Sequence, residues 1–193
     1  LAAGIEGLSW EGIAGAEGFA VDVETPLGRV ILGDAGESVY EGEVAPLLVI
    51  DTGGNDEYLL PVAATDAPGR PVSVLVELGG NDRYGYPGHL ERSAVQHLPP
   101  ADAAGRYDGD HPDVGDAFGP ISLSGVARQG AGILGVGLLF DLAGGDRYRS
   151  HKASQGAGIL GIGVLFDAAG NDGYWCVQGC QGAGSYGIGL LVD

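Results

Sequence analysis

A 26-residue internal repeat runs through this 193-residue chain and sets strong limits on its fold. The segment QGAGILGIGVLFDAAGNDGY begins at Gln155, and similar segments begin at Gln129 and Gln181. Earlier in the chain, LVIDTGGNDEY and LVELGGNDRY place Asp51 and Glu77 at the same 26-residue spacing. Repeats of this length are typical of folds in which each unit packs mainly on its neighbours. The repeat therefore predicts a stack of similar units.

The repeat is interrupted once and is preceded by a segment of different character. Glu77 and Asp141 occupy equivalent repeat positions but lie 64 residues apart, which we interpret as one repeat that carries a 38-residue insertion. We expect the repeats to occupy 46–193, with an insertion loop at about 85–128. Because terminal repeats are often atypical, we expect 1–45 to form an N-terminal cap and the first strands.

Two further strand signals lie in this N-terminal region. GFAVDVETPLGRVILGD predicts two strands joined at Pro26, Leu27 and Gly28. We interpret VILGDAGESVY as a divergent copy of the repeat. It ends at Tyr40, 18 residues before Tyr58.

The apolar part of each repeat alternates as a β-strand does. In the segment ILGIGVLF, one face would carry larger side chains, and the other would carry Ile159, Gly161, Gly163 and Leu165. Interior glycines make a helix costly, by roughly 1 kcal/mol each relative to alanine. We expect the core to be formed by the larger set, Leu160, Ile162, Val164 and Phe166. The glycine-rich face would then be covered closely by another layer of the same protein, with a ligand groove as the alternative.

These patterns predict an all-β protein. Short strands separated by glycine turns suit a parallel β-helix, or β-solenoid, in which each coil holds about 26 residues. The alternative is a stack of β-hairpins, as in a β-roll or a propeller, in which each repeat forms its own antiparallel pair.

The turn that follows each strand carries two carboxylates five residues apart. Stacked repeats would bring Asp141 close to Asp167 and Asp146 close to Asp172, and such columns of like charge repel unless they are neutralised. Carboxylate and turn carbonyl oxygens are the hard ligands that Ca²⁺ prefers. The candidate metal ligands in these turns are Asp51, Asp56, Asp82, Asp141, Asp146, Asp167 and Asp172. A purely structural turn is the alternative, because Gly, Asn and Asp are common turn residues.

The turn segments GGNDEY and GGNDRY resemble pieces of the glycine- and aspartate-rich nonapeptides of hemolysin-type (RTX) calcium-binding repeats. The resemblance covers some six residues of each unit. It implies a calcium-filled parallel β-roll of a secreted protein. It also implies particular ligands and turn formers. The implied ligands are Asp56, Asp82, Asp146 and Asp172, and the implied turn formers are Asn55, Asn81 and Asn171.

Tyrosine and glutamine recur at fixed repeat positions as well. We expect Tyr58, Tyr84, Tyr148 and Tyr174 to form an aromatic ladder beside the turn, with their hydroxyl groups at the solvent edge. We expect the repeated glutamines to form an amide ladder across the coils, as stacked Gln side chains can. These glutamines are Gln129, Gln155 and Gln181.

The insertion holds a second candidate cation site in the segment YDGDHPDVGD. Asp108, Asp110 and Asp113 offer closely spaced oxygens there, and His111 beside them raises a transition metal as an alternative. A solvated acidic loop is the third possibility. The two cysteines, Cys176 and Cys180, would either form a local disulfide or remain unrelated.

Charge excludes some classes of partner. With 26 acidic and 9 basic residues the formal net charge is −17, which repels nucleic acid and anionic membrane surfaces. Divalent cations are the natural complement, and adaptation to high salt is an alternative reading. The sequence has no uninterrupted apolar run of about 18 residues, so we expect no membrane insertion. It begins within a pattern, and we expect it to be a mature fragment or a piece of a longer protein.

The repeated acidic turns favour a structural function, because a catalytic group of residues would occur in one repeat only. We therefore expect a non-catalytic structural or adhesive β-solenoid module of a secreted or surface protein, stabilised by Ca²⁺. The alternative is a carbohydrate-active β-helix enzyme, a polysaccharide lyase or hydrolase, that uses carboxylates of 85–128. The expected partners are a polysaccharide or another protein chain that stacks on the end of the solenoid.

Overall fold

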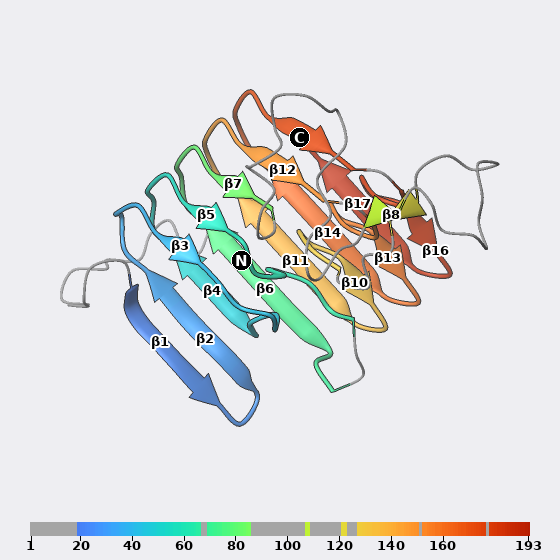
Figure 1. Ribbon diagram of the computed structural model, residues 1–193, viewed down its shortest axis with the longest axis horizontal. Coiled ribbons are helices and arrows are strands. Elements are labelled where there is room, and N and C mark those ends of the chain that lie inside the picture. Colours follow the sequence, from blue (N-terminus) through green and yellow to red (C-terminus); the bar gives the residue numbers. More distant parts are fainter. Residues whose placement is uncertain are drawn as a thin grey trace.

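The computed structural model describes residues 19–66, 69–85, 107–108, 121–122, 127–150, 152–176 and 178–193. The described chain contains strands and no helix, so the predicted all-β class is confirmed (Figure 1). It follows that none of the described residues forms a helix long and apolar enough to cross a membrane.

The largest sheet has seven strands in the order β1-β2-β4-β6-β11-β14-β17. Its strands are β1 (Phe19–Thr25), β2 (Gly28–Gly33), β4 (Leu48–Asp51), β6 (Val72–Glu77), β11 (Val136–Asp141), β14 (Ile162–Asp167) and β17 (Ile188–Val192). All neighbouring pairs in this sheet are parallel except β1 and β2. The predicted pair of N-terminal strands is confirmed, because Thr25 and Gly28 close the β1–β2 hairpin.

Two smaller parallel sheets run beside the large one. A separate two-stranded sheet is formed by residues 107–108 and 121–122. The five-stranded sheet contains β3 (Val39–Tyr40), β5 (Glu57–Tyr58), β7 (Arg83–Tyr84), β12 (Arg147–Arg149) and β15 (Gly173–Trp175). The three-stranded sheet contains β10 (Gly132–Ile133), β13 (Gly158–Ile159) and β16 (Gly184–Ser185). The antiparallel pair is β8 (Tyr107–Asp108) with β9 (Ile121–Ser122).

The pairing register follows the sequence repeat. In the seven-stranded sheet, Phe140 pairs with Phe166, 26 residues further along the chain. The other two sheets keep the same offset, as between β10 and β13 and between β12 and β15. Glu77 pairs with Asp141 across 64 residues, so the insertion leaves the register intact. Successive repeats therefore place equivalent residues opposite one another, and their strands lie side by side (Figure 1).

The N-terminal segment joins the same sheets. β2 and β3, from the region that we assigned to a cap, pair in parallel with β4 and β5. Tyr40 pairs with Tyr58 in spite of the shorter 18-residue step. The divergent copy of the repeat that ends at Tyr40 therefore pairs with the repeat that follows it.

The prediction of which strand face forms the core is wrong. In β14 the buried residues are Gly163, Leu165 and Asp167, whereas Ile162 is exposed and Val164 and Phe166 are only partly covered. The buried aliphatic column contains Ile31, Val49, Leu75, Leu139 and Leu165, each with 0% exposure. Because side chains of a strand alternate between its faces, an inward Leu165 brings glycine and aspartate inward with it.

The reason for this choice of face is the close approach of the backbone across the interior. A Cβ atom at Gly163 would lie 2.0 Å from the carbonyl oxygen of Ala157, and one at Gly137 would lie 2.2 Å from that of Ala131. Both carbonyls belong to the chain beside the three-stranded sheet. The expectation that another layer of the same protein covers the glycine face is therefore confirmed.

Gly163→Ala tests this close contact. The added methyl group would displace backbone, so we expect the free energy of unfolding to fall by about 1–3 kcal/mol, as for other overpacked interiors. Urea unfolding measures the change. Gly69→Ala is the matched control, because a Cβ atom there would meet nothing within 4 Å. Equal stability of the two variants would contradict the packing described above.

Candidate metal centre

Two columns of acidic side chains lie inside the stack. The first column stands at the ends of β4, β6, β11 and β14 and consists of Asp51, Glu77, Asp141 and Asp167. The second column stands in the turns before β5, β7, β12 and β15 and consists of Asp56, Asp82, Asp146 and Asp172. Every member is at most 1% exposed except Asp172, which is partly covered. Such deep burial of so many carboxylates is unusual, because a buried charge is costly unless it is paired.

Glycine makes room for the second column. A Cβ atom at Gly144 would lie 1.9 Å from the carbonyl oxygen of Gly80 and 2.6 Å from Oδ2 of Asp146. Gly170 is similarly close to Gly144 and to Asp172. The turns can therefore approach each other only where a side chain is missing, and this approach brings the carboxylates together.

The second column fastens each turn to its neighbour. Oδ1 of Asp146 accepts a hydrogen bond from the backbone N–H of Asp82 at 2.6 Å, and Oδ1 of Asp172 accepts one from the N–H of Asp146 at 2.7 Å. Asp82 and Asp56 make the equivalent bonds at 2.7 and 2.6 Å. The Oδ2 atoms of all four have no hydrogen-bond partner. One oxygen of each carboxylate thus has a structural role, and the other is free to bind something else.

The first column lies against a column of stacked tyrosine rings. The ring centroids of Tyr40, Tyr58, Tyr84, Tyr148 and Tyr174 follow one another at 4.5, 4.7, 4.5 and 4.8 Å. These distances match the spacing of neighbouring strands, so the sheet sets the stack. The predicted aromatic ladder is confirmed. The prediction that its hydroxyl groups lie at the solvent edge is wrong, because they point to buried carboxylates.

The hydroxyl groups of this column are shared between carboxylates. The Tyr148 hydroxyl lies 2.9 Å from Oδ2 of Asp141 and 3.0 Å from Oδ2 of Asp167. Burial and the neighbouring carboxylates raise the pKa of Tyr148 well above its ordinary value, so it keeps its proton. A phenol has one proton to donate. Only one of the two carboxylates can accept it, but the Tyr84 hydroxyl donates to Asp141 at 2.8 Å and the Tyr174 hydroxyl donates to Asp167 at 3.0 Å. Each carboxylate therefore has a phenol donor, and this donor leaves its negative charge in place.

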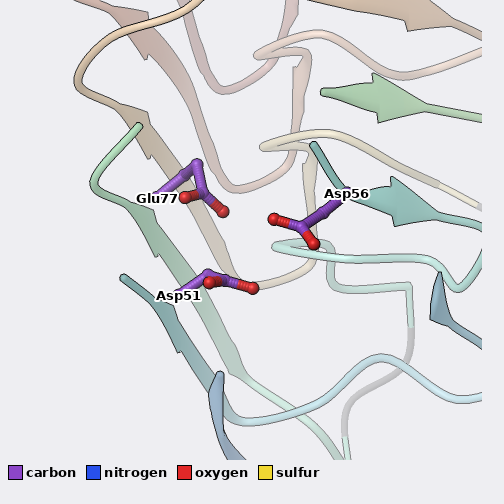
Figure 2. Close-up of side chains that lie close together, drawn as sticks. All are labelled: Asp51, Asp56 and Glu77. Atoms are coloured by element: carbon purple, nitrogen blue, oxygen red, sulfur yellow. The ribbon is translucent and has the colours of Figure 1, made fainter. Parts of the chain in front are cut away.

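The two columns face each other and form three acidic groups. In each group, one oxygen per residue lies within 4.8 Å of the others. The groups are Asp51, Asp56 and Glu77; Asp82, Asp141 and Asp146; and Asp146, Asp167 and Asp172. Figure 2 shows the first of them, in which carboxylates from β4, β6 and the turn before β5 converge. Oδ1 of Asp141 and Oδ1 of Asp167 have no hydrogen-bond partner either.

Burial and mutual repulsion make these groups hard to ionise. Desolvation first, and then neighbouring carboxylates, raise the pKa of Asp82 and Asp141 to about 8 and that of Asp56 and Asp146 to about 7. The same causes raise the pKa of Glu77 well above its ordinary value. At neutral pH the columns must therefore hold protons or positive ions.

The donor set of the groups consists only of carboxylate oxygens, which hard cations prefer over softer metals. The groups could accordingly hold metal ions. All seven aspartates predicted as ligands in the turns lie in these groups, namely Asp51, Asp56, Asp82, Asp141, Asp146, Asp167 and Asp172. The predicted closeness of Asp146 to Asp172 is confirmed by their 2.7 Å hydrogen bond.

Sequence reasoning missed Glu77 as a candidate ligand. Its signal was its place 26 residues after Asp51, which makes it the glutamate version of the first-column aspartate. Of the predicted second site, Asp108 lies in β8 without a described side chain, and Asp110 and Asp113 lie outside the described residues. That site stays a prediction.

The glutamines do not form the expected amide ladder. The side-chain nitrogen of Gln155 donates to the carbonyls of Tyr148 at 3.2 Å and Trp175 at 3.0 Å, and Gln129 bonds Tyr84 and Arg149 in the same way. Gln129 and Gln155 thus each connect the backbones of two neighbouring repeats. Nearby, the Sγ atoms of Cys176 and Cys180 lie at bonding distance, as expected for the local disulfide.

Comparisons with family models, with curated proteins and with solved structures find no match to this chain. The resemblance of the turns to RTX repeats stays a prediction. The chemistry of the acidic groups must therefore be judged from their own geometry.

Proposed function

We propose that the protein is a parallel β-solenoid that serves as a structural or adhesive scaffold and is stabilised by Ca²⁺ bound between its two acidic columns. We place it outside the cell or on the cell surface. The observation that carries the proposal is the set of buried carboxylate oxygens that face one another without hydrogen-bond partners at successive repeats.

The register supports the solenoid. Each of the repeats that begin at Gln129 and Gln155 contributes one strand to the seven-stranded, the five-stranded and the three-stranded sheet. These strands pair with the next repeat at a 26-residue offset. A stack of hairpins would instead pair strands in antiparallel fashion within a repeat. Parallel pairing of equivalent segments is the arrangement that a coil produces.

Calcium is the cation that fits the groups best. Ca²⁺ accepts six to eight oxygen ligands in flexible geometry, whereas Mg²⁺ requires near-ideal octahedral geometry and usually keeps several waters. The groups are buried, and their carboxylates come from turns and strand ends rather than from one rigid element. Extracellular calcium modules work at calcium concentrations of about 10⁻⁴–10⁻³ M. A local disulfide also suits an oxidising compartment.

The recurrence of the acidic groups favours a scaffold over an enzyme. The second and third groups have the same composition, with one first-column and two second-column carboxylates in each. A reacting bond needs a single centre, whereas a repeated centre stabilises every coil. The partners that we propose for such a scaffold are a polysaccharide or another protein chain that stacks on the end of the solenoid. The alternative of a carbohydrate-active enzyme depends on carboxylates of 85–128, and most of these lie outside the described residues.

Removal of calcium tests the proposal. We expect the midpoint of thermal unfolding, followed by circular dichroism, to fall when a chelator replaces Ca²⁺. Ligand binding to the folded state alone contributes about 2.7 kcal/mol for one site at a 100-fold excess over the dissociation constant. Mg²⁺ at the same concentration is the control. An unchanged midpoint after chelation would reject calcium as the stabilising ion.

A further inference from the structure

We propose that two neighbouring metal ions share the carboxylate of Asp146, so that the ions of the second and third acidic groups bind as a bridged pair. This inference rests on the proposed calcium function and adds to it the arrangement and coupling of the ions. It starts from the fact that Asp146 belongs to both groups. The first group has no member in common with the other two.

The contacts of Asp146 leave it able to bridge. Its side chain is 1% exposed, Oδ1 accepts one hydrogen bond from the N–H of Asp82 at 2.6 Å, and Oδ2 has no partner. A carboxylate has about four lone-pair sites. Three sites therefore remain for cations. Asp141 belongs to one of the two groups and Asp167 to the other, and each has one oxygen, Oδ1, without a hydrogen-bond partner.

Charge balance favours two ions over one. The second and third groups together contain five carboxylates, Asp82, Asp141, Asp146, Asp167 and Asp172. Two Ca²⁺ ions would neutralise four of these five negative charges, and tyrosine hydroxyl groups donate to Oδ2 of Asp141 and Asp167. One ion alone would leave three uncompensated charges, and isolated buried charges are strongly unfavourable.

The first group provides an internal comparison. Glutamate replaces aspartate at position 77, and its side chain is one methylene longer. Glu77 joins Asp51 and Asp56 of the preceding repeat, whereas Asp141 and Asp167 each join two second-column aspartates. The structure therefore assigns one separate ion to the first group and a bridged pair to the other two.

Three matched substitutions test the bridge. Asp82→Asn, Asp146→Asn and Asp172→Asn each keep the Oδ1 acceptor for a backbone N–H and remove the charge at an unpartnered Oδ2. Asp146→Asn is expected to release two Ca²⁺ ions per chain relative to the wild type, and each of the others one. Metal content is measured on folded protein after gel filtration in buffer of fixed free Ca²⁺. Circular dichroism verifies the fold of each variant.

A measurement on the wild type keeps the test independent of how the variants fold. Tb³⁺ replaces Ca²⁺ and is sensitised by the adjacent tyrosines, and Eu³⁺ is then mixed in as an energy acceptor. Bridged ions lie close together, so the Tb³⁺ lifetime is expected to shorten in mixed-loaded protein compared with protein loaded with Tb³⁺ alone.

The outcomes separate this inference from the proposed function. If the wild type binds no Ca²⁺ and chelation leaves its stability unchanged, the calcium function fails and the bridge with it. If the wild type binds Ca²⁺ but Asp146→Asn releases only one ion, or the Tb³⁺ lifetime does not change on mixing, the bridge is wrong and the calcium function stands. Release of two ions together with a shortened lifetime is the expected result.

Discussion

The metal-free protein is expected to lose stability as the pH rises from about 4 to about 8, which is opposite in direction to ordinary acid denaturation. Desolvation, followed by repulsion between the columns, raises the pKa of Asp141 and Asp82 to about 8, from an ordinary value of 3.8. Desolvation is also the main reason why the pKa of Asp51 rises to about 6. A carboxyl group that is harder to ionise in the folded state binds more protons there than in the unfolded state.

The sign follows from proton linkage. Where the folded state binds more protons, the free energy of unfolding falls as the pH rises. The contribution of each group is fully present below its unfolded pKa of about 3.8 and is lost as the pH passes its folded value, between about 6 and 8. One pKa unit corresponds to about 1.4 kcal/mol. Because five of the carboxyl groups have a raised pKa of this kind, the expected loss is at least several kcal/mol.

Urea unfolding in the presence of chelator, at pH 5.5 and at pH 8.5, measures this loss. Calcium-saturated protein is the control. Its ligands must be deprotonated to bind, so calcium is expected to restore stability mainly at the higher pH. Asp141→Asn removes one titrating group and should reduce the pH dependence of the metal-free protein. Metal-free protein that is as stable at pH 8.5 as at pH 5.5 would show that the columns do not hold protons.

Tyr148→Ala is expected to lower the free energy of unfolding by about 3–5 kcal/mol, the usual cost of truncating a buried aromatic side chain. Tyr148 is 0% exposed and is stacked between Tyr84 and Tyr174 at 4.5 and 4.8 Å. The substitution also removes the hydroxyl group that lies between Asp141 and Asp167. Chemical denaturation measures the change.

Two further variants separate the ring from the hydroxyl. Tyr148→Phe keeps the stack, and Asp141 and Asp167 retain the hydroxyl groups of Tyr84 at 2.8 Å and Tyr174 at 3.0 Å. Its expected cost is therefore smaller, about 1–3 kcal/mol. Tyr186→Ala, at a tyrosine that is 94% exposed, should change stability by less than about 0.5 kcal/mol. If Tyr148→Ala costs no more than Tyr186→Ala, the tyrosine column does not stabilise the core.

The tyrosine column lies beside acidic columns whose stacked carboxylates would repel one another when ionised. Parallel stacking places equivalent residues about 4.8 Å apart, so any ionised position in a repeat becomes a column of like charge. Here backbone N–H groups bind the second column, and phenol hydroxyl groups bind the first. Neither partner neutralises the charge. Protons at low pH and calcium at higher pH are the two neutralising agents that we propose.

Much of this arrangement could be predicted from periodicity. The 26-residue spacing correctly predicted that Asp141 lies beside Asp167 and that the tyrosines stack, because equivalent residues of stacked repeats must be neighbours. It also predicted as ligands seven aspartates that the structure places in the three acidic groups. Glu77 was not predicted as a ligand because it is a glutamate at a repeat position that aspartate occupies in the other repeats.

The orientation of the strands could not be predicted in this way. Alternation divides ILGIGVLF into two faces, and hydrophobic size favoured the face of Val164 and Phe166 as the core. The structure buries Leu165 with Gly163 and Asp167 instead. The gain comes from contacts across the interior with residues outside this strand, namely the carbonyl of Ala157 against Gly163 and the hydroxyl of Tyr174 on Asp167.

The amino-acid sequence by itself determined the all-β class, the repeat length and the identity of the residues that stack, because these depend only on local preference and on spacing along the chain. The tertiary structure alone decided which face is buried, how the tyrosine hydroxyl groups are oriented, and which carboxylates converge into groups. These features depend on what lies across the interior. A buried carboxylate is stable only where partners from other strands reach it, and the spacing along one strand does not record those partners.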